Sequence, residues 1–309
     1  MRPSIHLMIS VEDVRAAEER IKGRVRRTPV LEAGPSTFFK LEYAQHAGSF
    51  KTRGMFNQIL AAGPIPPAGV VVASGGNAGL AAAYAAGRLG VPAEVFVPET
   101  APPVKVAKLG KLGARVTQVG AEYAEAAAAS AVHAERTGAL FLHAYDNPGM
   151  VAGNGTLGLE LLDDLEFDTV LVAVGGGGLA AGVAAALADR PVRVVGVEPE
   201  NCPTLRSALD AGVPVDVPVA GVAADSLGAR RIGLLPYQIM VLTGMSSLLV
   251  DDPAIVEARR RLWDDYRIVV EHGTAVAYAA LTSGAYRPAD GERVVVLLCG
   301  ANSDLGDLA

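Results

Sequence analysis

The chain has 309 residues, of which 50% are apolar, and a formal net charge of −6. This length and apolar content suit one large α/β unit or two closely packed lobes, and they exclude a disordered chain. The negative charge and the lack of a basic stripe exclude nucleic acid as a partner, because nothing would neutralise its phosphates.

Short β-branched segments alternate with longer alanine- and leucine-rich segments, which predicts an α/β fold with a parallel sheet covered by helices. We expect strands at 70–73, 93–97, 115–119, 140–143, 169–174, 192–198 and 293–298. We expect helices at 79–89, 104–109, 121–136, 151–165, 179–188, 254–266 and 274–282. Prolines in 64–68 and 212–220 predict loops there.

The cysteines and the apolar runs favour a cytoplasmic protein with no membrane partner. Cys202 and Cys299 are the two cysteines, too few for a disulfide framework, which favours a reducing compartment. The N-terminus lacks a long apolar run with a small-residue cleavage site, so we expect no signal peptide. Segment 169–188 carries no charge, but the four consecutive glycines at 175–178 favour a strand, a turn and a helix over a membrane span.

Lys51 lies between glycines in the segment GSFKTRG at 48–54. Most lysines are surface cations, and this segment alone would not argue otherwise. The flanking glycines, the neighbouring Phe50 and the motifs further along the chain favour a lysine that forms a Schiff base with an aldehyde cofactor.

Three further segments have glycine where a predicted strand ends, the edge of a parallel sheet at which ligands bind. SGGNAG at 74–79 offers backbone N–H groups to a carboxylate, although a plain turn with an N-capping Ser or Asn explains it equally well. VGGGGLAAG at 174–182 predicts a phosphate cradle, and with Glu198 its spacing also fits a dinucleotide fingerprint. CGAN at 299–302 ends a buried strand with Cys299, which is either an inert core thiol or a weak donor to a heterocyclic nitrogen.

In this order, KLEYAQHAGSFKTRG (40–54), SGGNAG, VGGGGLAAG and CGAN resemble the fold-type II pyridoxal-phosphate enzymes. AGNGTLGLE (152–160), VVGVEPEN (194–201) and VVEHGTAVAYAAL (269–281) are similar to the serine/threonine dehydratase and serine racemase branch. SGGNAGLAAAYAAGRLG (74–90) and SLGARRIG (226–233) are similar to the liver-type serine dehydratases. The resemblance covers about residues 26–305 and removes the dinucleotide interpretation, in which Lys51 and Cys299 have no role.

The resemblance implies a tryptophan-synthase-β-like fold with two open, twisted, mostly parallel sheets flanked by helices. It implies a large cofactor-binding domain made of residues 1–51 and 145–309, with a small domain, 52–144, inserted in it. It also implies a homodimer that binds pyridoxal 5′-phosphate and a small amino-acid substrate.

Site residues carry over from the resemblance one by one. Lys51 is implied to hold the cofactor, with Phe50 against one ring face and Ser226 near the other. Asn77 is implied to meet the ring hydroxyl and Cys299 to face the pyridine nitrogen. The residues implied to bind the phosphate are Gly175, Gly176, Gly177, Gly178 and Leu179. The residues implied to bind the substrate carboxylate are Ser74, Gly75, Gly76 and Ala78.

Members of this branch also carry a cation near the phosphate loop, which implies K⁺ or Mg²⁺ here. The matching positions are the Glu198 side chain and the carbonyls of Cys202, Leu227 and Ala229. A helix-capping or solvated carboxylate is an equally good interpretation of Glu198.

The implied reaction is a β-elimination that converts L-serine or L-threonine to a 2-oxo acid and ammonia. Gly75 stands where racemases carry a serine that acts as the second proton carrier, which favours elimination over racemisation. The chain also has Ala47 in place of Ser or Thr, Asn154 in place of Gln and His272 in place of Pro. The alternatives are another β-replacement or serine racemase activity, a dehydratase for a bulkier β-hydroxy amino acid, and a catalytically silent cofactor-binding subunit.

Overall fold

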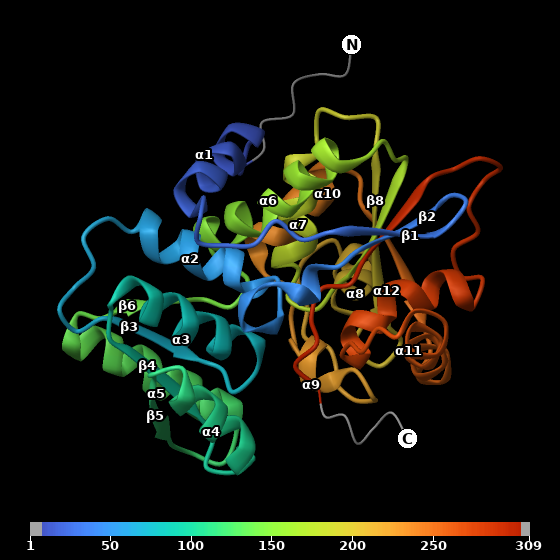
Figure 1. Cartoon of the computed structure of the whole chain (residues 1–309). Coiled ribbons are helices and arrows are strands. Elements are labelled where there is room, and N and C mark those ends of the chain that lie inside the picture. The colour runs from blue at the N-terminus through green and yellow to red at the C-terminus, as the bar shows by residue number, and fades with distance from the viewer. Residues whose placement is uncertain (1–7, 304–309) are drawn as a thin grey trace.

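The computed structural model describes residues 8–303, which form two open sheets with helices packed around them (Figure 1). The larger sheet has the spatial order β1 (Val30–Gly34), β2 (Thr37–Lys40), β10 (Val294–Leu297), β7 (Thr169–Ala173), β8 (Arg193–Pro199) and β9 (Ser246–Val250). The smaller sheet has the order β5 (Arg115–Gln118), β4 (Ala93–Val97), β3 (Val70–Ala73) and β6 (Leu140–Phe141). Neighbouring strands are parallel except in the β1–β2 hairpin, which confirms the predicted fold class.

The helices divide between the two sheets. Around the larger sheet lie α1 (Val11–Ile21), α6 (Pro148–Asp164), α7 (Gly178–Ala186), α8 (Thr204–Ala211), α9 (Ala224–Leu227), α10 (Leu234–Leu242), α11 (Asp252–Tyr266) and α12 (His272–Thr282). With the smaller sheet lie α3 (Asn77–Leu89), α4 (Pro103–Lys111) and α5 (Tyr123–Thr137). Helix α2 (Lys51–Ala61) packs against both α3 and α6, and the short 3-10 turns Glu42–Ala44 and His46–Gly48 precede it.

All the strands and helices predicted from the sequence are present, with ends that differ by up to three residues, and 64–68 and 212–220 are loops. The uncharged stretch 169–188 is β7, a glycine turn and α7, as expected. Within residues 8–303, no helix combines the length and the apolar character that a membrane-spanning segment needs. The division into domains 1–51 with 145–309 and 52–144 stays a prediction.

The larger sheet is buried on both faces. Val170 and Val172 of β7 belong to an apolar cluster with α6 and α7, whereas Leu171 and Ala173 belong to a second cluster with α11 and α12. Strands covered in this way need apolar residues at every position, which is why β7 reads as a continuous apolar run.

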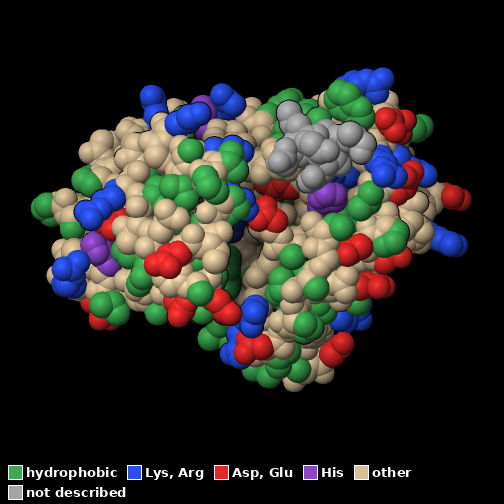
Figure 2. Space-filling view, turned by 90° about the horizontal axis from the view of Figure 1, so that it is seen from below, with side chains coloured by type: hydrophobic (Ala, Val, Ile, Leu, Met, Phe, Trp, Pro, Cys, Tyr) green, Lys and Arg blue, Asp and Glu red, His purple; other side chains and the backbone are tan. Residues whose placement is uncertain are grey.

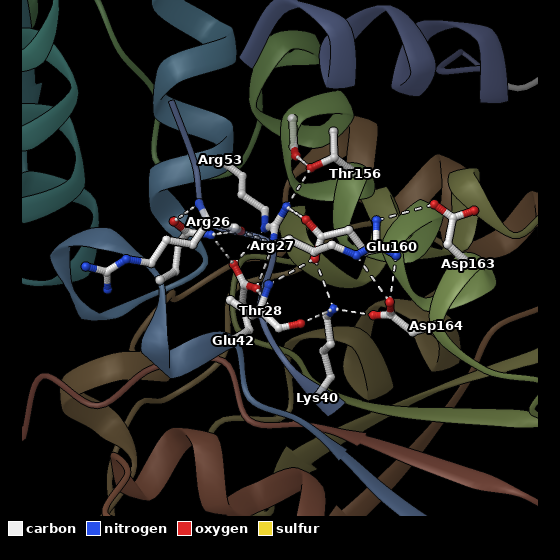
Figure 3. Close-up of polar contacts among 12 residues, drawn as sticks. Arg26, Arg27, Thr28, Lys40, Glu42, Arg53, Thr156, Glu160, Asp163 and Asp164 are labelled. Carbon is white, nitrogen blue, oxygen red and sulfur yellow. Dashed lines mark hydrogen bonds and ion pairs between the residues drawn. The ribbon is translucent and has the colours of Figure 1, made fainter. Parts of the chain in front are cut away.

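A cluster of buried charged residues surrounds Arg53, in the first turn of α2 (Figure 3). Its guanidinium binds both oxygens of the Glu42 carboxylate, at 2.7 and 2.9 Å, and reaches Glu160 Oε1 on α6 at 2.7 Å. Lys40 Nζ lies 2.9 Å from the other oxygen of Glu160 and 3.0 Å from Asp164 Oδ2. Lys40 and Glu42 are 0% exposed and Arg53 is 1% exposed, so water does not screen these charges.

The cluster balances its own charges. Burial alone would raise the pKa of Glu160, but the neighbouring Arg53 and Lys40 hold that pKa below its ordinary value. The Glu42 and Glu160 carboxylates likewise raise the pKa of Arg53 against its burial. Both effects keep the ion pairs charged inside the protein, where each charge depends on its partner.

We expect Glu42→Ala to lower the free energy of unfolding by about 3–5 kcal/mol, because it leaves the Arg53 guanidinium buried without its bidentate partner. The control is Glu257→Ala, which removes the exposed pair with Arg261 on α11. That change should cost less than about 1 kcal/mol. Urea unfolding followed by circular dichroism measures both, and equal losses in the two variants would refute a stabilising role for the buried cluster.

Candidate active site

The segments that follow the carboxyl ends of β3, β7 and β10 line a single pocket. On the face shown in Figure 2, the molecular surface is hollowed between two bulky parts. The pocket is lined by Phe50, Lys51, Asn77, Tyr145, Ala173, Gly175, Gly176, Gly177, Gly178, Leu179, Ser226, Leu227, Glu271, Gly273 and Cys299. All the residues predicted to bind the cofactor are in this set. The structure therefore brings them together, while their contacts with a cofactor stay predictions.

Lys51 is the first residue of α2 and its amine points into the pocket. Lys51 Nζ donates a hydrogen bond to the carbonyl of Ala144 and lies 5.0 Å from the centre of the Phe50 ring. Burial lowers the pKa of this amine to about 8, although the nearby Cys299 and Glu271 act in the opposite direction. A lysine with this pKa has a larger neutral fraction near neutral pH than an exposed lysine has, and the neutral amine is the nucleophile and the base.

The glycine turn after β7 lies directly against Tyr145. A Cβ atom at Gly176 would come within 2.3 Å of the Tyr145 ring, and one at Gly178 within 2.8 Å of its carbonyl oxygen. Gly177 has φ +89°, a left-handed backbone conformation that glycine adopts without strain. These constraints explain the run of glycines, and the turn leads into the N-terminus of α7, whose backbone N–H groups suit an anion.

Cys299 closes the other side of the pocket, directly after β10. Its Sγ lies 3.3 Å from Thr274 Oγ1, whose hydroxyl donates to the Gly300 carbonyl at 2.8 Å. Burial raises the pKa of the Cys299 thiol to about 12, so the group is a neutral thiol at physiological pH. It can form a weak hydrogen bond with a heterocyclic nitrogen but supplies no charge to it.

The residues predicted to bind the substrate carboxylate form the turn between β3 and α3. Ser74 Oγ accepts a hydrogen bond from Gly76 N at 3.2 Å, and Gly76 precedes the first residue of α3. Ser74, Gly75, Gly76 and Ala78 stand beside Asn77, which is the residue of this turn that lines the pocket. The turn has the unpaired helix N-terminus that a carboxylate favours.

Sequence reasoning missed the carboxylate of Glu271, which lies in the same pocket. Both of its oxygens are 2.9 Å from Asn77 Nδ2, and Oε1 also accepts from the backbone N–H of Asn302 at 2.9 Å. Burial raises its pKa, although the hydrogen bonds from Asn77 and Asn302 act against the rise. The signal was a single glutamate after the apolar run 268–270, which could have marked a buried functional acid. Tyr145 was also missed.

Glu198, predicted as a cation ligand, has its carboxylate at the N-terminus of α8. It accepts hydrogen bonds from Leu205 N at 2.6 Å, Arg206 N at 2.8 Å and Thr204 Oγ1 at 3.2 Å, and from the hydroxyl of Ser247. These contacts fit the helix-capping interpretation of Glu198. The cation site with the carbonyls of Cys202, Leu227 and Ala229 stays a prediction.

Comparisons with known proteins show the family to which the chain belongs. The family model described as "Pyridoxal-phosphate dependent enzyme" matches residues 21–300. The chain is 36% identical to an L-threonine ammonia-lyase of Geobacter sulfurreducens, over 94% of this chain and 75% of that protein. It is 37% identical to a phenylserine dehydratase of Ralstonia pickettii, over 94% and 92%. The solved structure of maize serine racemase superposes with a TM-score of 0.89, at 32% identity, over 97% of this chain and 95% of that chain. On the family match and on these relatives, the chain belongs to the fold-type II pyridoxal-phosphate dependent enzymes.

Proposed function

We propose that this enzyme eliminates water from L-serine or L-threonine, and that hydrolysis of the resulting enamine gives pyruvate or 2-oxobutanoate and ammonia. The observation that carries the proposal is the Lys51 amine, whose pKa is lowered to about 8 beside the glycine turn. The names of the relatives, L-threonine ammonia-lyase and threonine dehydratase among them, support the same reaction class.

The pocket residues fit pyridoxal phosphate. The glycine turn 175–178 leaves no room for a Cβ at three of its positions and would hold the phosphate with backbone N–H groups. Lys51 would bind the aldehyde carbon, Asn77 the ring hydroxyl and Cys299 the ring nitrogen. The bound cofactor supplies an electron sink for the α-carbon of the substrate.

The remaining steps belong to side chains and backbone of this chain. The turn Ser74–Ala78 would bind the substrate carboxylate through N–H groups at the start of α3. The Lys51 amine, held by the Ala144 carbonyl, would then remove the α-proton, for which its lowered pKa suits it. The neutral thiol of Cys299 supports no full positive charge on its partner, which favours early loss of a β-hydroxyl over a long-lived carbanion.

We expect Lys51→Ala to abolish release of 2-oxo acid and ammonia and to leave the fold intact, because the side chain acts through its amine. Purified wild-type protein should be yellow, and borohydride should bleach it. Mass spectrometry should then find the cofactor on the peptide that contains Lys51. An adduct on Lys40 or Lys105 would overturn the assignment, and a wild-type protein inactive on a panel of β-hydroxy amino acids would favour the silent-subunit alternative.

The main alternative reaction on this scaffold is racemisation of serine, and Gly75 bears on it. An elimination needs one base, whereas a racemase needs a second proton carrier on the opposite face. A Cβ built at Gly75 lies 3.5 Å from Val97 Cγ1, an ordinary contact, so a side chain fits there. Glycine at this position has no hydroxyl to deliver that proton, which supports elimination.

We expect the wild-type enzyme to form negligible D-serine from L-serine, and Gly75→Ser to form D-serine measurably. Chiral chromatography of the reaction mixture measures both. Gly75→Ala is the control, since it adds the Cβ without the hydroxyl and should not racemise. Efficient racemisation by the wild type would contradict our interpretation of Gly75.

The substrate side chain that the enzyme prefers is a question separate from the type of reaction. The phenylserine dehydratase relative makes an aryl-bearing β-hydroxy amino acid the second candidate substrate. Rates of 2-oxo acid release from serine, threonine and phenylserine, compared as kcat/KM, distinguish the candidates.

We also propose that a K⁺ or Mg²⁺ ion binds near Glu198, on the resemblance described above. If the ion ties its loops to the phosphate turn, chelation and dialysis into a tetraalkylammonium buffer should weaken cofactor binding, and added K⁺ or Mg²⁺ should restore it. Glu198→Gln should remove this response. A wild-type affinity for the cofactor that is unchanged by dialysis would leave Glu198 as the cap of α8 alone.

Finally, we propose a cytoplasmic homodimer. Leu234, Val241 and Leu242 of α10 are 56%, 48% and 43% exposed, and their spacing puts them along one side of the helix. Such a stripe suits contact with a second copy. Sedimentation at the monomer mass would contradict the dimer.

The cytoplasmic location has its own test. A disulfide between Cys202 and another cysteine in protein isolated from cells would contradict a reducing compartment.

A further inference from the structure

Asn302, just beyond the last strand, contacts three separate segments of the pocket wall. Its side-chain Nδ2 donates to the carbonyl of Ala47 and to Asn77 Oδ1, both at 2.7 Å. Its backbone N–H donates to Glu271 Oε1 at 2.9 Å. These partners come from the loop before Lys51, the start of α3 and the residue before α12.

The chemistry of these partners decides the orientation of both amides. The Ala47 carbonyl can only accept, so Asn302 must turn its Nδ2 toward it. The same Nδ2 has a second hydrogen for Asn77, which must therefore present Oδ1. Asn77 Nδ2 is then directed at the Glu271 carboxylate, which accepts in its ionised form.

The contacts with Asn302 and Glu271 limit which polar group Asn77 can offer to the pocket. Its Oδ1 is occupied by Asn302, and one hydrogen of Nδ2 is occupied by Glu271. Among the hydrogen bonds of the described residues, Nδ2 donates only to the two oxygens of this one carboxylate, which a single amide hydrogen can serve, and Asn77 lines the pocket. Asn77 therefore presents an N–H donor and not a carbonyl acceptor.

Asn302 also restrains the loop that leads to Lys51. Ala47 has φ 55° and Gly48 has φ 70°, so two consecutive residues are left-handed, which is costly for alanine. The Gly48 carbonyl accepts from Ala301 N at 2.9 Å. A Cβ at Gly48 would come within 2.8 Å of Asn302 Oδ1, so the two segments are in close contact.

We propose that Asn302 is a positioning residue that fixes the Asn77 amide as a donor to the oxygen on the cofactor ring and holds the 47–48 loop for Lys51. The proposal rests on the role of Asn77 proposed above, and it concerns cofactor binding, not the choice of substrate. Its failure is therefore distinguishable from a failure of the proposed reaction.

The test uses Asn302→Asp, which keeps the shape and replaces the donor by an acceptor. The new carboxylate would then face two other acceptors, the Ala47 carbonyl and Asn77 Oδ1, so Asn77 would lose the contact that orients it. We expect the dissociation constant for pyridoxal phosphate to rise about tenfold, the effect of about one net hydrogen bond. We also expect a changed ratio between the near-ultraviolet and the yellow absorption bands of the bound cofactor, which reports on the ring oxygen. Gln118→Glu, the same type of change at an exposed site on β5, should alter neither.

A double-mutant cycle separates positioning from general stability. Asn302→Ala adds no charge, so it serves even if Asn302→Asp does not fold. If Asn302 acts through Asn77, the losses of cofactor affinity in Asn302→Ala and Asn77→Ala are not additive in the double variant. Additive losses, or an absorption spectrum of Asn302→Asp identical to that of the wild type, would overturn the proposal.

Discussion

The paired contact between Arg53 and Glu42 is the interaction on which the architecture around the site depends. Arg53 lies two residues after Lys51, in the same first turn of α2. Its guanidinium joins the 3-10 turn at Glu42 to Glu160 of α6. Because a buried guanidinium is stable only where all its partners are in place, the start of α2 has one position relative to α6. Because Lys51 belongs to the same turn, its backbone is fixed relative to α6 as well.

Burial of the pocket stabilises the uncharged form of each of its titratable groups. It lowers the pKa of Lys51 and raises those of Glu271 and Cys299, so the neutral form of each group is more stable here than it would be in water. Among the described residues that line the pocket, Lys51 is the only Lys or Arg. An anionic group such as a phosphate must therefore rely on backbone N–H groups at the glycine turn, which leaves the Lys51 amine available for proton transfer.

The site also depends on contact between the two sheets. Lys51 follows β2 of the larger sheet in the chain, whereas the turn predicted to bind the substrate carboxylate follows β3 of the smaller sheet. Asn77, at the start of α3, is hydrogen-bonded to Glu271 and Asn302 across this boundary. An exposed ion pair between Lys105 of α4 and Asp225 of α9 also joins the helices of the smaller sheet to those of the larger one. Asp225 immediately precedes Ser226 in the chain. Residues predicted to bind the substrate and residues predicted to bind the cofactor thus share one hydrogen-bonded framework.

The sequence by itself determined seven of the strands, seven of the helices and the residues predicted to bind the cofactor, which the structure brings together in one pocket. Fully buried strands such as β7 are continuous apolar runs, and glycine turns at their ends are legible in one dimension. It did not reveal α2, because its buried face carries Thr52, Arg53, Asn57 and Gln58, which hide the apolar period of a helix. The half-buried hairpin β1–β2 and the edge strand β9 likewise lack a clear pattern.

Only the tertiary structure decided how Glu42, Glu160, Glu271 and Asn302 are used. An isolated glutamate or asparagine in a sequence carries no mark of its partner, which here lies between 11 and 255 residues away. The same holds for the pKa of Lys51, since desolvation depends on the atoms that surround the amine and not on its neighbours in the chain. Local pattern specifies the elements, whereas long-range electrostatics and hydrogen bonding become defined only when the chain has brought distant polar groups out of water and into contact.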